Sequence, residues 1–157
     1  MSRAFTEQWA ADVQARLSQG FTEQDREGRL PDYWTWVDTA ASTFSGVLAL
    51  GAVPVKGDDL DAGEFVAIRI AEGAVQEVRV ITPSEARASD YLLVGTYEGW
   101  QKFLGGYDAA RTVMYRHLQL DHGNLLGFFN RVYYWIQLLS LLHQVPSEVV
   151  LPETVAA

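Results

Sequence analysis

Hydrophobic positions near the amino terminus recur at helical spacing. The residues of this stripe lie four apart, and they are Phe5, Trp9, Val13 and Leu17. Such spacing places them on one face of a helix. Thr6 is typical of a helix N-cap, and Gly20 is typical of a helix end. We therefore expect an opening helix whose apolar face covers a sheet.

Extended patterns dominate the middle of the chain. Strands are predicted over residues 43–50, 64–71, 75–81 and 90–94, with turn residues between them. The connection Glu72-Gly73-Ala74 is short enough for a hairpin, so the second and third strands should be antiparallel neighbours. With a strand near Leu118, this predicts an α+β fold: about five strands in a mostly antiparallel sheet, with helices packed on one face.

Residues 25–31 are charged and contain glycine, so we expect a loop there. The aromatic cluster Tyr33, Trp34 and Trp36 follows. Two interpretations stay open: the cluster packs over the core, or it stays exposed at a ligand entrance or a partner surface.

A helix is predicted directly after the fourth strand. Thr96 is its expected cap, and Gly105 and Gly106 end it. Its apolar residues recur at spacings of three and four: Tyr97, Trp100, Phe103 and Leu104.

A second short helix should begin at Asp108 and carry Val113 and Met114. Leu118 and Leu120 then alternate with polar residues, as in a half-buried strand. A strand, two small helices, another strand and an apolar helix in this order favour an apolar concavity over a catalytic cleft.

Residues 123–143 are apolar nearly all round, and we expect one continuous C-terminal helix. One face consists of Leu125, Phe128, Val132, Trp135, Ile136 and Leu139, and it is widened by Leu126, Phe129, Tyr133 and Leu142. The narrow polar strip consists of Asn130, Arg131, Tyr134, Gln137 and Ser140. Docking on a sheet needs only one apolar stripe, so a ligand, a partner subunit or the tail 149–155 must cover the second.

A membrane span is the first alternative for this helix, because roughly 20 apolar residues cross a bilayer. Asn130, Arg131 and Gln137 lie in its middle, and a central Arg alone costs about 2.5–3.5 kcal/mol on insertion. We therefore expect no stable membrane insertion.

Composition narrows the class of protein. The chain has 157 residues, 48% of them hydrophobic and 12% aromatic, which predicts one domain over residues 1–157 with enough apolar side chains for a core and a cavity. A formal charge of -8 disfavours nucleic acid or an anionic membrane as the standing partner. Zero cysteines and a polar amino terminus suit a cytoplasmic location.

Catalytic and metal motifs are weakly represented. His117 and His122 flank the last strand, but their odd separation points them to opposite faces of a regular strand, and His143 lies a whole helix away. The acidic run Asp58, Asp59, Asp61 and Glu64 lacks the pattern of a calcium loop. No phosphate loop, nucleophile elbow or dinucleotide fingerprint occurs, so we predict no catalytic residues, no metal and no cofactor.

The order of these elements resembles the sterol carrier protein type 2 superfamily of small lipid-binding domains. The resemblance is carried by DYLLVGTYEGWQKFLGG, by the helix at Asp108 and by LQLDHGNLLGFF, preceded by the strands FVAIRI and AVQEVRVI. It spans most of the chain, from Phe5 to about Leu142. Its most specific part is the pattern of Tyr97, Trp100, Leu104 and Gly106.

This resemblance implies an elongated tunnel between the sheet and the C-terminal helices that accepts sterols, fatty acyl chains and other lipids. The corresponding residues here, which we expect to bind the ligand, are Trp100, Phe103, Met114, Leu118, Leu120, Leu125, Phe128, Phe129 and Val132.

Three hypotheses remain open. The chain is a carrier of an apolar small molecule, with Arg131 or the aromatic cluster orienting a polar head group. Alternatively, it is a small enzyme acting on such a molecule, with Tyr115, His117 or Asp121 as acid–base groups. In the third, it is an obligate homodimer that buries the second apolar stripe without any ligand.

Overall fold

A computed structural model describes residues 2–55, 59–109, 112 and 118–151, and its centre is a five-stranded sheet in the order β4-β3-β2-β5-β6. The strands are β2 (Gly46–Val53), β3 (Glu64–Ala71), β4 (Ala74–Ile81), β5 (Tyr91–Thr96) and β6 (Leu118–His122). The β2–β5 pair is parallel, and the other three pairs are antiparallel. The predicted α+β fold with a mostly antiparallel sheet is confirmed.

The two ends of the described chain meet in a second, two-stranded sheet that the sequence pattern did not predict. Here β1 (Ser2–Arg3) pairs in parallel with β7 (Ser147–Glu148). The Trp9 indole Nε1 also donates a hydrogen bond to Ser147 Oγ at 2.8 Å. The opening helix is therefore fastened to the segment that follows the C-terminal helices.

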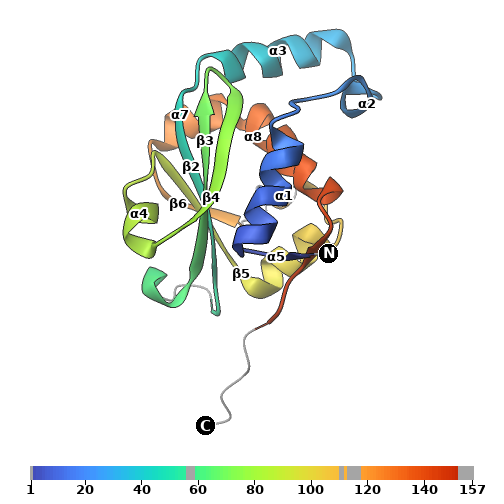
Figure 1. The fold of residues 1–157 in the computed structure, drawn as a ribbon. Coiled ribbons are helices and arrows are strands. Elements are labelled where there is room, and N and C mark those ends of the chain that lie inside the picture. The colour runs from blue at the N-terminus through green and yellow to red at the C-terminus, as the bar shows by residue number, and fades with distance from the viewer. Residues whose placement is uncertain (1, 56–58, 110–111, 113–117, 152–157) are drawn as a thin grey trace.

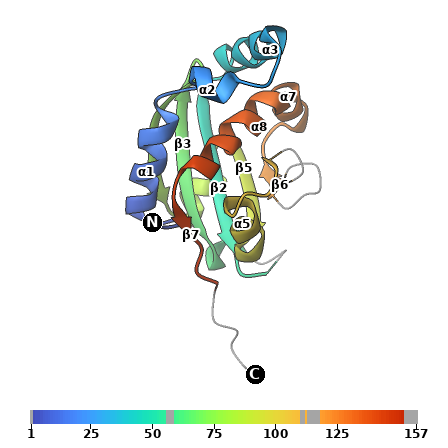
Figure 2. The same cartoon turned by 90° about the vertical axis from the view of Figure 1, so that its right-hand side faces the viewer.

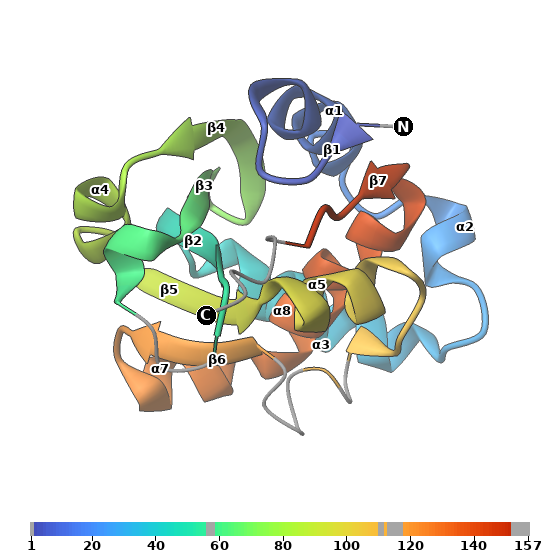
Figure 3. The ribbon, with the colours of Figure 1, turned by 90° about the horizontal axis from the view of Figure 1, so that it is seen from below.

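The central sheet buries both of its faces, but unequally. One face lies under α1 (Glu7–Leu17), α5 (Tyr97–Leu104) and α8 (Val132–Ser140), whereas the short α4 (Pro83–Arg87) lies on the other (Figures 1 and 3). Side chains alternate between the faces as strand geometry requires: Val66 and Ile68 join the larger core, and Phe65 and Ala67 join the smaller one. The helices thus gather mainly on one face, as predicted.

The opening helix matches its prediction closely. Thr6 Oγ1 accepts a hydrogen bond from the Trp9 backbone N–H, and Gly20 adopts a positive φ of 68° shortly after the helix ends. All four residues of the apolar stripe are buried: Phe5, Trp9, Val13 and Leu17. Figure 2 shows α1 standing in front of the sheet beside α8.

The loop predicted over residues 25–31 is confirmed only for residues 27–30, which lie between two helices, and a strand starting at residue 43 is wrong. The chain forms α2 (Glu23–Arg26) and then α3 (Pro31–Ser42), and β2 begins only at Gly46. Proline at the first helical position suits a helix start. Trp34, Val37 and Ala41 are the buried side chains of α3, so part of the aromatic cluster does pack on the core.

The predicted hairpin between β3 and β4 is confirmed. Its two turn residues, Glu72 and Gly73, have positive φ values of 49° and 80°, as a type I′ turn requires. A Cβ at Gly73 would lie 2.7 Å from the Ala41 carbonyl, so close approach of α3 also requires glycine there.

The continuous helix predicted over residues 123–143 is wrong. The segment is divided into α7 (Leu125–Asn130), α8 and the 3-10 turn η2 (Leu141–Gln144). At the joint, Arg131 has φ -115° and ψ 21°, and its guanidinium donates to Thr43 Oγ1 at 3.1 Å and to the Gly127 carbonyl at 3.2 Å. Arg131, which the sequence pattern placed in a polar strip, therefore stabilises the joint between α7 and α8 through these hydrogen bonds.

Candidate functional site

Helix α5 places two large aromatic side chains over the centre of the sheet. Trp100 and Phe103 are fully buried, with ring centroids 6.0 Å apart. The Trp100 indole Nε1 donates to the Gly51 carbonyl of β2 at 2.8 Å, and the Phe103 ring lies 4.6 Å from the His143 ring. Helix α5 is thus fixed to both the sheet and η2.

A second aromatic cluster lies between β5 and the C-terminal helices. Phe128 of α7 stacks on Trp135 of α8 at 5.6 Å, and Tyr91 and Phe44 meet Trp135 at 5.7 and 5.0 Å. The Trp135 indole also donates to the Phe128 carbonyl at 3.0 Å, across the break between the helices. These contacts fix the angle at which α7 leaves α8.

Three apolar side chains of α7 and α8 point into solvent. We call them the α7–α8 flank: Leu126, Phe129 and Tyr133, which are 72%, 48% and 51% exposed. Tyr133 touches one residue of α3, Tyr33, with ring centroids 5.7 Å apart. The described part of the chain therefore leaves uncovered three of the side chains that the sequence placed on the second apolar stripe.

Of the nine residues expected to bind a ligand, the six whose side chains the structure describes fall into three groups. Trp100, Phe103 and Phe128 are core residues, Leu120 and Val132 are half-buried against that core, and Phe129 belongs to the flank. Met114 and the side chains of Leu118 and Leu125 lie outside the described residues. Ligand binding by this set stays a prediction.

Two adjoining hollows lie beside α8, and sequence reasoning missed both. The α3 hollow, about 290 Å³, is bordered by α1, α3, the β3–β4 turn and α8, and Tyr134 and Leu138 line it. The α2 hollow, about 520 Å³, is lined by Phe21, Gln24, Asp25, Gln137, Ser140, Leu141 and Gln144. Phe21 and Leu141 line both hollows. The capping box of Thr22 and Asp25 was the signal that could have located α2.

Tyr134 of α8 lies in the core and not on the exposed face of the helix. The sequence pattern placed it in the polar strip, but the side chain is fully buried. Its hydroxyl donates to the Gly73 carbonyl at 3.1 Å, and burial raises the pKa of the phenol, which keeps it neutral.

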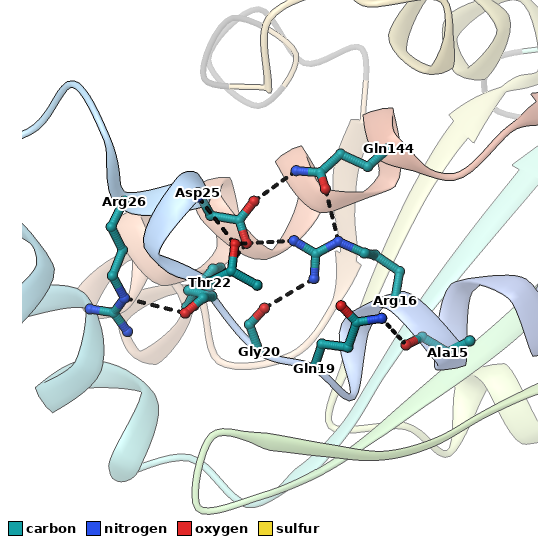
Figure 4. A network of polar contacts seen from close by, with 9 residues as sticks. Ala15, Arg16, Gln19, Gly20, Thr22, Asp25, Arg26 and Gln144 are labelled. Carbon is teal, nitrogen blue, oxygen red and sulfur yellow. Dashed lines mark hydrogen bonds and ion pairs between the residues drawn. The ribbon is translucent and has the colours of Figure 1, made fainter.

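A polar network includes Asp25 and Gln144, two of the residues that line the α2 hollow, and Figure 4 shows it. The Arg16 guanidinium pairs with the Asp25 carboxylate, and Gln144 bridges them by accepting from Arg16 Nε at 2.9 Å and donating to Asp25 Oδ1 at 2.8 Å. Burial by itself raises the pKa of Asp25, but hydrogen bonds from Gln144, Arg16 and Thr22 outweigh it and hold the pKa well below its usual range. The network joins α1, α2 and η2.

The structure gives other roles to the acidic run considered as a metal site. Asp59 and Asp61 pair with Arg87 at 3.2 and 3.0 Å, and Glu64 accepts from the Tyr97 hydroxyl at 2.7 Å. Asp58 lies outside the described residues. Across the described ranges, no three His, Asp or Glu side chains gather in a way that could hold a metal ion.

Of the acid–base candidates, Tyr115 and His117 lie outside the described residues, as do the side chains of Asp121 and His122. His143 packs against Phe103. Within the described ranges, no helix combines the length and apolar run that crossing a bilayer requires.

Comparison with known proteins places the fold. No protein-family model matches the chain, and no curated protein does. A crystal structure of sterol carrier protein 2 is 23% identical, with a TM-score of 0.67 over 92% of this chain and 100% of that one. A solution structure of a Thermus thermophilus protein, described as possibly a sterol carrier protein, is 22% identical, with a TM-score of 0.65 over 96% of this chain and 94% of its own. This chain therefore has the fold of sterol carrier protein 2.

Proposed function

We propose that this protein binds an apolar small molecule, such as a sterol, a fatty acyl chain or another lipid, and transfers it without catalysing a reaction on it. Its fold is that of sterol carrier protein 2 over nearly the whole chain. The observation that carries the proposal is the α7–α8 flank, because exposed side chains such as Leu126 and Phe129 suit contact with an apolar molecule.

The proposed tunnel lies between the sheet and the helices α5, α7 and α8. Trp100, Phe103 and Phe128 would form its buried wall, while the half-buried Leu120 and Val132 and the exposed Phe129 would lie nearer solvent. Met114, Leu118 and Leu125 complete the proposed set. A wall made of aromatic and aliphatic carbon selects its ligand by shape and volume rather than by hydrogen bonds.

The expected affinity follows from the apolar area that a ligand would bury and from the free-energy cost of association. Burying about 400 Å² of ligand apolar area at about 25 cal/mol/Å² is worth about 10 kcal/mol. Association costs some 4–15 kcal/mol, so we expect a dissociation constant of about micromolar order. A missing methylene changes such binding by only about 1–3 kcal/mol, so the site should accept several related lipids.

A fluorescent fatty acid tests the proposal in two steps. Titration measures its dissociation constant, and a vesicle-to-vesicle assay measures whether the protein accelerates its transfer. Phe129→Ser should weaken binding about tenfold, because about 1.4 kcal/mol of apolar contact is lost. The matched control is Val80→Ser, a partly exposed residue on the opposite edge strand, β4, which should leave binding unchanged. Absence of saturable binding by the unaltered protein would refute the function.

A further inference from the structure

We propose that the α2 hollow is a second binding site, which accepts a neutral, hydroxyl-rich group such as a sugar or polyol. This inference does not depend on the lipid tunnel. The hollow lies between α2 and the α8–η2 segment, and its volume of about 520 Å³ is within the range of small-molecule sites, about 300–1,000 Å³.

The charges at this hollow argue for a neutral ligand. Asp25 is the one ionisable side chain among the residues that line it. Its carboxylate is already satisfied by Arg16, Gln144 and Thr22. An anion would meet this carboxylate, and a cation would have to displace the Arg16 guanidinium from it. Neither charge is favoured.

Neutral hydrogen-bonding groups at the hollow are available to a ligand. In the part of the chain that the structure describes, the Gln24 side-chain amide has no hydrogen-bond partner. Gln137 uses its Nε2 to reach the Tyr33 hydroxyl at 2.7 Å, and Ser140 Oγ donates to the Ile136 carbonyl at 2.7 Å. The Gln137 amide oxygen and the Ser140 oxygen therefore remain as acceptors, and Gln24 offers both a donor and an acceptor. Hydroxyl groups can satisfy each of them.

The neighbouring α3 hollow offers space for an apolar extension of such a group. Phe21 and Leu141 line both hollows, and beyond them Leu17, Tyr134 and Leu138 line the α3 hollow. A hydroxylated head with an alkyl chain would place the head among the amides and the chain past Phe21. The same chemistry occurs in a free sugar and in the head group of a glycolipid, and the two sources differ only in the chain.

Titrations with octyl β-glucoside below its micellar concentration, methyl β-glucoside and octyl sulfate separate these sources. Calorimetry gives the affinities, and NMR shifts of the Gln24 and Gln137 side-chain amides report where binding occurs. We expect octyl β-glucoside to bind and shift both amides, and octyl sulfate to bind more weakly. Binding of methyl β-glucoside with equal affinity would assign the site to a free sugar, and much weaker binding would assign it to a glycolipid head group.

Two variants test the location. Ser140→Leu should abolish glucoside binding by filling the hollow, while Gln24→Ala, whose side chain is exposed, should weaken it about two- to tenfold. Gln101→Ala, an exposed glutamine on α5, is the matched control and should change nothing.

The inference is overturned if octyl β-glucoside does not bind, if octyl sulfate binds equally well, or if neither variant changes the affinity while both remain folded. Binding of the fluorescent fatty acid should be unchanged in Ser140→Leu, which keeps failure of this site distinct from failure of the tunnel.

Discussion

Helix α1 and the α7–α8 segment are both rich in apolar residues, but the fold covers them to different extents. Every apolar residue of the α1 stripe is buried, and the side chains outside the stripe are mostly polar. The α7–α8 segment also buries much of one face, including Phe128, Trp135, Ile136 and Leu139, but leaves Leu126, Phe129 and Tyr133 in solvent.

The difference separates apolar residues that the fold needs from those that it does not use. A helix docks on a sheet through one stripe, and α1 has only that stripe. The α7–α8 segment has more, and contacts among the described residues do not account for the excess. Substitutions in the two regions should therefore affect different properties: the free energy of unfolding for α1, and binding for the flank.

The largest effect is expected for Trp9→Ala in α1. Trp9 is fully buried and donates to Ser147, so removing it leaves a cavity, and the free energy of unfolding should fall by about 3–5 kcal/mol. The measurement is a urea unfolding curve. As the control, Trp36→Ala removes an exposed tryptophan and should cost less than about 0.5 kcal/mol. Similar costs for both would contradict the burial described for α1.

Asp25→Asn breaks the bridge that joins the two regions through Arg16 and Gln144. Asp25 and Arg16 are largely buried, so loss of the pair should cost about 3 kcal/mol at neutral pH. Because folding lowers the pKa of Asp25, its contribution is fully present above the unfolded pKa of about 3.9, decreases as the pH falls below that value, and is lost only as the pH falls through the lower folded pKa.

The stability difference between the unaltered protein and Asp25→Asn should therefore become smaller, without vanishing, between neutral pH and pH 3, as unfolding curves over this range would show. Asp38→Asn, which breaks the more exposed pair with Arg26, should cost less than about 1 kcal/mol. A stability difference for Asp25→Asn that does not depend on pH would contradict the role given to its carboxylate.

A smaller effect is expected for Leu126→Ser in the flank. Its side chain is mostly exposed, so the free energy of unfolding should change by less than about 0.5 kcal/mol. Hydroxyl-radical footprinting of the unaltered protein extends this test. Oxidation of Phe129 and Tyr133 should fall when the fluorescent fatty acid binds, while that of Val80 stays constant. Equal oxidation with and without the ligand would show that the flank does not cover it.

The sequence predicted an element correctly where the cap, the hydrophobic spacing and the stop or turn residues all indicated the same element. Around Thr6 and Thr96, cap, spacing and stop residues all pointed to one helix, and in the turn at Glu72 and Gly73 the chemistry matched the strand pattern. Residues 23–42 failed this test, because charged and glycine residues hid two helices, one with a capping box and one with a proline start.

The break at Arg131 depends on contacts with Thr43, far away in the chain, which periodicity does not contain. The same is true of the pairing of β1 with β7 and of the two hollows, whose walls come from distant elements. Thus the sequence predicted the layered fold and the apolar excess of the C-terminal segment. It did not predict the break between α7 and α8 or the amide-lined hollow beside α8.

Native mass spectrometry of the protein as isolated from cells tests the central claim most directly. If the apolar excess of α7–α8 serves a ligand, the monomer should carry adducts whose masses match extractable lipids, and Phe129→Ser should reduce their abundance. A homodimer without any adduct would contradict the claim and assign the flank to a subunit interface.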